Sequence, residues 1–108
     1  MATVFVDGRN VQRSQWPNLS DEELLERCRE WAERHGHEVV LVFDGEAPAG
    51  AIGSGNESAD DWLIREVPKH PGAWLVTSDR ALREAAGEKA ARVIGGGGFL
   101  EELTRRRK

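Results

Sequence analysis

Three largely apolar runs mark the chain, and an aspartate follows each of them within two residues. The runs and their aspartates are 4–6 with Asp7, 39–43 with Asp44, and 73–77 with Asp79. A continuous apolar run is typical of a strand buried on both faces, as in a parallel sheet. The sequence therefore predicts three buried strands that each deliver an aspartate at the carboxyl end.

Apolar residues at helical spacing lie between these runs. Residues 20–23, Ser-Asp-Glu-Glu, have the spacing of a capping box, and Gly36 suits the C-terminal cap of the helix that follows. Ser58 is the expected N-cap of the next helix. The remaining predicted elements are a helix at about 79–86, a short fourth strand at 91–94 and a last helix from near Phe99, after the four glycines 95–98.

The alternation of strands and helices predicts the fold class, a three-layer α/β/α domain with a small parallel sheet of about four strands. Two segments are expected as connections. Residues 11–19 are a polar link, and residues 45–56, with four glycines and a proline, are expected to form a mobile loop. In such sheets the functional site lies outside the carboxyl ends of the strands, so the aspartates should converge there.

Composition predicts one soluble domain spanning residues 1–108. The chain is 39% apolar and 31% charged, and no apolar run approaches the roughly 20 residues that span a bilayer. No signal peptide is visible, and the single Cys28, on the apolar face of a helix, suits core packing in a reducing cytoplasm. The net charge of −4 gives no global attraction to nucleic acid. The basic tail at 105–108 suits either phosphate binding or a solvated helix end.

The acidic residues near the predicted edge are candidates for a metal site. Besides the strand-end aspartates they include Asp60, with Glu57 and Asp61 close by. Clustered carboxylates repel one another without a cation, and hard oxygen ligands suit Mg²⁺ or Mn²⁺. A cation held there would activate water and stabilise charge on a phosphodiester.

Each candidate also has an ordinary structural role open to it. Asp7 and Asp44 suit turns before glycine, Asp60 and Asp61 suit a helix N-terminus, and Asp79 suits a helix cap. Asn10, Thr77 and Ser78 would support the carboxylates or satisfy local backbone groups. Trp16 would stack on a base or anchor its loop. His35, His37 and His70 should lie at the opposite end of the sheet or in connections.

Five blocks of the sequence resemble the NYN domains of the PIN-like nuclease group. Residues 6–11 are similar to their "DGYNV" opening, and the other blocks follow in the same order at 42–45, 57–61, 76–80 and 98–103. The resemblance extends over essentially the whole chain and is strongest to the bacterial YacP-like branch. Arg9 stands where the opening motif has an aromatic residue, and the region between Asp44 and Glu57 is short.

This resemblance implies a PIN-like, metal-dependent endoribonuclease in the cytoplasm. Asp7, Asp60 and Asp79 would hold Mg²⁺ or Mn²⁺, with Asn10 and Asp44 assisting catalysis and Glu57, Asp61 and Thr77 behind them. The expected substrate contacts are Arg9, Ser78, Arg80 and Trp16. The partner would be RNA, together with a ribosome or a second protein, and no membrane. The alternatives are a binding module for RNA or protein on the same fold and, disfavoured by Arg9 two residues after Asp7, a phosphohydrolase.

Overall fold

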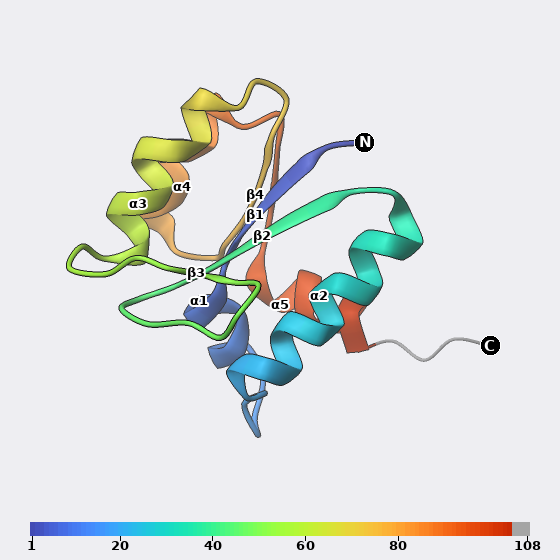
Figure 1. The fold of residues 1–108 in the computed structure, drawn as a ribbon. Coiled ribbons are helices and arrows are strands. Elements are labelled where there is room, and N and C mark those ends of the chain that lie inside the picture. Colours follow the sequence, from blue (N-terminus) through green and yellow to red (C-terminus); the bar gives the residue numbers. More distant parts are fainter. Residues whose placement is uncertain (105–108) are drawn as a thin grey trace.

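The computed structural model describes residues 1–104, so the predicted basic tail at 105–108 lies outside the described residues. Five parallel strands form one sheet in the order β3-β2-β1-β4-β5. Their bounds are β1 Thr3–Asp7, β2 Glu38–Phe43, β3 Ile52–Gly53, β4 Trp74–Val76 and β5 Arg92–Ile94. The first strand of the chain is therefore the central strand of the sheet (Figure 1).

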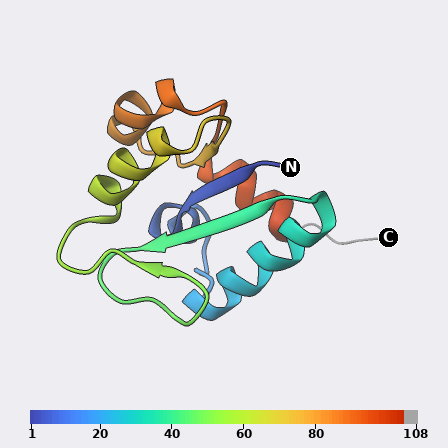
Figure 2. The ribbon, with the colours of Figure 1, turned by 45° about the horizontal axis from the view of Figure 1, so that its top comes forward.

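Helices cover both faces of this sheet, which confirms the three-layer α/β/α prediction. Their bounds are α1 Gly8–Arg13, α2 Asp21–His35, α3 Ala59–Glu66, α4 Arg80–Ala86 and α5 Gly96–Thr104, with single 3₁₀ turns at Val67–Lys69 and Gly87–Lys89. Helices α1, α2 and α5 lie on one face, and α3 and α4 lie on the other (Figures 1 and 2). No helix within residues 1–104 has the length and apolar character needed to cross a bilayer.

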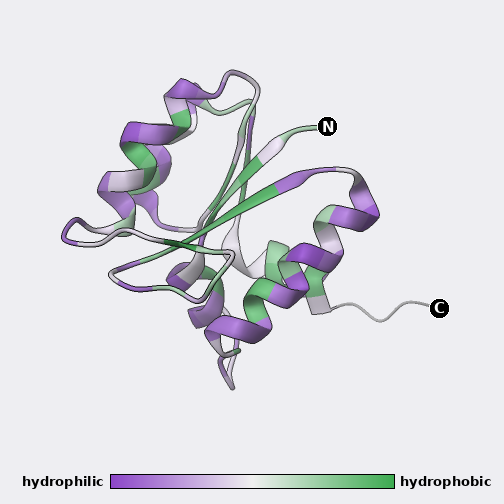
Figure 3. Cartoon of the chain, viewed as in Figure 1, coloured by the Kyte–Doolittle hydropathy of each residue, from purple (hydrophilic) through white to green (hydrophobic). Residues whose placement is uncertain are grey.

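Alternating side chains of β1 separate two hydrophobic cores. Val4 and Val6 pack with α1, α2 and α5, whereas Phe5 packs with α3 and α4. The two clusters explain why β1 is apolar at consecutive positions, since both of its faces are covered. Figure 3 shows the corresponding pattern, with apolar colour along the central strands and polar colour on the outer faces of the helices. Cys28 lies fully buried in the first of these cores, as predicted.

The predicted helix boundaries are confirmed where the capping signals were strong. Ser20 and Glu23 form the capping box at the start of α2, and Gly36 ends that helix in the left-handed region at φ 68°. The hydroxyl of Ser58 accepts a hydrogen bond from the backbone N–H of Asp61 at the start of α3.

Three elements differ from the prediction. Residues 8–13 form α1 directly after β1, although Val11 is the only large apolar residue of this helix. The segment 45–56 is more than an unpaired mobile loop, because it contributes β3, a two-residue strand paired with β2. Helix α5 begins at Gly96 rather than near Phe99. Tertiary packing overrides intrinsic propensity in these short, glycine-containing segments.

Candidate active site

A polar cavity opens at the carboxyl edge of the sheet, where the sequence predicted the aspartates to converge. Its volume is about 170 Å³. The residues that line it come from the ends of β1 and β2, from α1, and from the starts of α3 and α4. They are Asp7, Arg9, Asn10, Arg13, Asp44, Ser58, Asp60 and Asp79. The structure thus brings together the four predicted aspartates and Asn10.

Asp7 is the most buried of these carboxylates, with 5% of its surface exposed. The hydroxyl of Thr77, on the neighbouring strand segment, donates a hydrogen bond of 2.9 Å to its Oδ2. Burial raises the pKa of Asp7 to about 6, the Thr77 bond opposes that rise, and the charges of Asp60 and Asp44 add to it. Asp7 is therefore a carboxylate whose ionised form is disfavoured by its surroundings.

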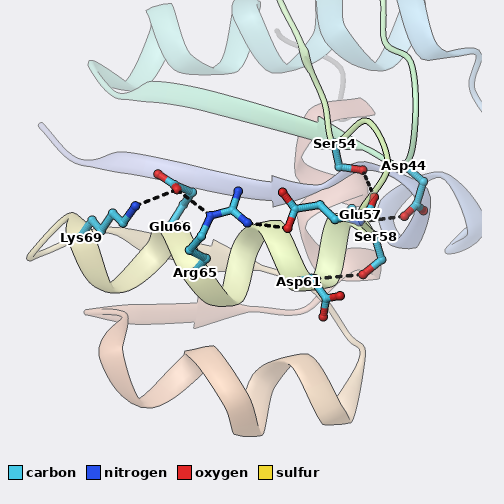
Figure 4. Close-up of polar contacts among 9 residues, drawn as sticks. Asp44, Ser54, Glu57, Ser58, Asp61, Arg65, Glu66 and Lys69 are labelled. Carbon is cyan, nitrogen blue, oxygen red and sulfur yellow. Dashed lines mark hydrogen bonds and ion pairs between the residues drawn. The ribbon is translucent and has the colours of Figure 1, made fainter.

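The other three aspartates line the cavity from different elements and are less buried. Burial and the negative charge of Asp79 raise the pKa of Asp60, with smaller contributions from Asp44 and Asp61. One oxygen of Asp79 accepts a 2.9 Å bond from the N–H of Leu82, which caps α4. One oxygen of Asp44 accepts a 2.8 Å bond from the N–H of Ala59 (Figure 4). Asp79 therefore has the predicted capping role and also lines the cavity, and Asp44 lines the cavity while it binds the start of α3.

Two predicted acidic residues do not line the cavity. Asp61 is exposed, and only its backbone N–H takes part in the cap with Ser58. Glu57 forms an ion pair with Arg65, which also pairs with Glu66 along the outer face of α3 (Figure 4). The Arg65 hydrogen bond lowers the pKa of Glu57. The prediction that Asp61 and Glu57 stand directly behind the carboxylates therefore finds no contact in the described structure.

Hydrogen bonds made by polar side chains connect the segments that carry the carboxylates. Asn10 Oδ1 accepts a 2.8 Å bond from the N–H of Ser78, and Ser78 Oγ accepts a 2.8 Å bond from the N–H of Gly96. Thr77 Oγ1 also accepts a bond from the N–H of Asp79. A Cβ atom at Gly96 would lie 2.4 Å from Asn10 Oδ1, so glycine permits α5 to approach α1 here. Asn10 and Ser78 thus bind neighbouring backbone, which is one of the two alternatives, whereas Thr77 fulfils both, since it also donates to Asp7.

The predicted substrate contacts fall in different places. Arg9 lines the cavity, but its guanidinium is bound to Asp21 at 2.8 Å and to Gln12 at 2.9 Å. Arg80 is exposed beside Glu84 on α4 and does not line the cavity. Trp16 is 85% exposed, which excludes the role of a packed loop anchor.

Two cavity residues, Arg13 and Ser58, were not predicted as site residues, and Ser58 was expected only as a helix cap. Arg13 follows Asn10 by three residues and Arg9 by four, so on a helix its side chain lies beside both of them. This spacing is meaningful only on a helix, and the sequence pattern predicted a polar connection from residue 11 onward.

The cavity suits a divalent cation in its donor chemistry. Carboxylate oxygens are hard ligands of the kind that Mg²⁺ and Mn²⁺ prefer. A cation would offset both the burial and the smaller mutual repulsion that raise the pKa values of Asp7 and Asp60. Within residues 1–104, however, no group of three or more His, Cys, Asp or Glu side chains is arranged to hold a metal ion directly. Mg²⁺ commonly retains several waters and contacts only one or two carboxylates, which is compatible with such a cavity.

The fold and the cavity define a parallel α/β protein with an acidic site at the carboxyl edge of its sheet. Among solved structures, the chain shares its fold with a crystal structure of a mutant of Rae1 (YacP) from Bacillus subtilis, at a TM-score of 0.76. The match covers 95% of this chain and 75% of that chain, with 22% sequence identity. The YacP-like fold expected from the sequence is thus confirmed. No protein-family model and no curated protein matches the chain.

Proposed function

We propose that this protein is a metal-dependent endoribonuclease that hydrolyses RNA phosphodiester bonds at the carboxyl edge of its sheet. The observation that carries the proposal is the convergence of four aspartates from separate chain segments on one cavity. Capping and turn formation do not require such convergence. The order of NYN-like blocks in the sequence and the fold shared with Rae1 (YacP) both support nuclease chemistry over other uses of an acidic cavity.

In this proposal Asp7, Asp60 and Asp79 hold Mg²⁺ or Mn²⁺, and Asp44 and Asn10 assist. The cation would supply charge neutralisation at the phosphodiester and activation of water. The chain itself supplies position. Thr77 fixes the orientation of Asp7 through the 2.9 Å hydrogen bond, and the capping bond to Leu82 fixes that of Asp79. These bonds hold the carboxylates in place before any ligand arrives, which lowers the cost of organising the site.

Arg9 acts as a positioning residue in this site. Its guanidinium bridges α1 to Asp21 at the start of α2 and lies 4.9 Å from the centre of the Phe43 ring. The aromatic side chain of the NYN opening is replaced here by Arg9, which lines the cavity. We propose a cytoplasmic location, with RNA as the substrate and a ribosome or a second protein as the partner that presents it.

The test is cleavage of single-stranded and structured RNA with Mn²⁺, Mg²⁺ or EDTA. Asp7→Asn should lower the metal-dependent rate by at least about 100-fold, since loss of a direct ligand costs more than loss of its supporting contacts. Asp61→Asn is the matched control, because this carboxylate is exposed and does not line the cavity. Equal rates for wild type and Asp7→Asn would contradict the proposal.

The second candidate function is a non-catalytic binding module for RNA or protein on the same fold. It is favoured by the lack, within residues 1–104, of a ready set of three metal-binding side chains. Folded protein that binds RNA but cleaves none with either metal would support this candidate.

A further inference from the structure

Arg9 and Arg13 both belong to α1 and line the same cavity, but their surroundings differ. Arg9 is held by Asp21 and Gln12. Arg13, one helical turn later, is exposed and forms no ion pair or side-chain hydrogen bond with any residue that the structure describes. Arg13 therefore brings an uncommitted positive charge to the rim of a cavity whose other charges are mainly negative.

Trp16 follows Arg13 by three residues and is the exception among the tryptophans. Trp31 is buried, and Trp62 and Trp74 are half-buried and pack on the cores, whereas Trp16 is 85% exposed. Tryptophan is highly buried on average in folded proteins, so a nearly free indole is unusual. Three residues of chain span at most about 11 Å, so the Cα atoms of Arg13 and Trp16 lie no farther apart than that.

We infer that Arg13 and Trp16 form a contact surface for single-stranded RNA, in which Arg13 binds a backbone phosphate and Trp16 stacks on an unpaired base. This inference rests on the proposed function and adds to it the two residues that would contact the strand outside the acidic cavity. Four carboxylates repel phosphates along most of the cavity, so a strand that enters the site gains most by passing over the α1 wall. Arginine binds phosphate oxygens with paired donors, and an indole stacks on any base whose face is free.

The pairing of these two contacts selects for unpaired RNA. Inside an RNA helix the base faces are covered by their neighbours, so only loops, ends and single strands offer a base to an aromatic side chain. A phosphate contact alone does not discriminate between the two forms. The selectivity therefore depends on Trp16, and the electrostatic part of binding depends on Arg13.

The experiment measures binding in EDTA, where metal-dependent cleavage is absent. The probes are an oligouridylate, an abasic oligoribonucleotide of the same length, and an RNA duplex. Trp16→Ala should weaken oligouridylate binding by about 5- to 100-fold and leave abasic binding unchanged. Arg13→Gln should weaken both and lower the salt slope by about 0.7. Ile64→Ala and Arg34→Gln are the matched controls, being an exposed apolar residue and an exposed arginine away from the cavity.

The outcomes separate this inference from the nuclease proposal. Oligouridylate should also quench tryptophan fluorescence in wild type but much less in Trp16→Phe. If wild type cleaves RNA while Trp16→Ala and Arg13→Gln bind oligouridylate like the controls, the inference is overturned and the nuclease stands. If the binding pattern holds while no metal supports cleavage, the inference stands and the nuclease proposal fails. Equal loss on the oligouridylate and the abasic probe in Trp16→Ala would also overturn it.

Discussion

The two ends of the sheet use polar and aromatic residues in opposite ways. At the amino end, Trp31 and Trp74 both pack on His37, at ring-centre distances of 5.4 and 4.6 Å, and on each other at 6.5 Å. The indole of Trp31 donates a 2.7 Å hydrogen bond to Glu102, and His37 Nδ1 accepts a 3.1 Å bond from the N–H of Ala2. Every polar group named here has a partner, and the aromatic rings pack on one another. This end contributes to the stability of the fold.

At the carboxyl end, Asp7, Asp44 and Asp79 each accept a hydrogen bond from the protein, whereas no hydrogen bond to the Asp60 carboxylate forms within the described residues. In the described part of the chain, none of the four belongs to an ion pair. The hydrogen bonds hold three of these carboxylates in place, while the negative charges of the group repel one another. Such a cluster of like charges lowers the stability of the fold, so the carboxyl end of the sheet is where a ligand is expected to bind. The contrast predicts that mutations at the amino end destabilise the protein, and that removing charge at the carboxyl end stabilises it.

The largest effect on stability should come from the amino end. Trp31→Ala removes a buried ring that contacts His37 and Phe99, and should lower the free energy of unfolding by about 3–5 kcal/mol. Trp16→Ala removes the same side chain from an exposed position and should change this free energy by less than about 0.5 kcal/mol. Urea denaturation of both variants measures these changes. Similar losses of unfolding free energy in the two variants would contradict the contrast between the two ends of the sheet.

In EDTA, Asp7→Asn should increase the free energy of unfolding rather than lower it. The pKa of Asp7 rises from 3.8 to about 6 in the folded state. The folded protein therefore binds more protons than the unfolded chain between these values, and wild-type stability falls as the pH rises through this window. Asparagine carries no charge and removes this loss. The free energy of unfolding of Asp7→Asn should therefore exceed that of wild type by about 3 kcal/mol at pH 7 and by less than about 1 kcal/mol at pH 4.

Denaturation curves at the two pH values, with Asp61→Asn as the control, measure this difference. A gain of the same size at pH 4 and pH 7 would show that charge on Asp7 is not its cause. Added Mn²⁺ should reverse the order of stability, because the cation binds the folded wild type more tightly than the variant.

The smallest effect should come from Glu102→Gln at the amino end. The amide oxygen of glutamine can still accept the hydrogen bond from Trp31, and only the half-exposed contact with His35, at 3.6 Å, loses its charge. The expected destabilisation is below about 1 kcal/mol. A thermal melt of Glu102→Leu, which cannot accept the bond, should show a clearly larger loss, and equal melts for the two would contradict the role given to this bond.

The sequence predicted the layers of the fold and the place of the site because both depend on long or repeated signals. The apolar runs before Asp7, Asp44 and Asp79 specify buried parallel strands, and parallel strands end at one edge. The capping box at Ser20 and the glycine at Gly36 specify the longest helix. The histidines lie away from the site as expected: His37 precedes β2, and His70 packs on Phe5 before β4.

What the sequence did not predict depends on packing between distant segments. Helix α1 has few helical signals of its own, and it is fixed by burial of Val11 and by Arg9 binding Asp21. Missing α1 meant missing Arg13 as a cavity residue. The helical glycines of α5 have poor propensity, and the start of this helix lies close to α1, where only a residue without a side chain fits against Asn10.

The strand order also determines when the site can form during synthesis. Strand β1 is made first, yet it is central, so its side facing β4 stays unpaired until Trp74–Val76 has been added. Until then neither Thr77 nor Asp79 is present to complete the surroundings of Asp7. Copies of the chain that stop early therefore lack the assembled cavity and carry an open sheet edge, which exposes them to aggregation and proteolysis. The cavity is therefore complete only after Asp79 has been added to the growing chain.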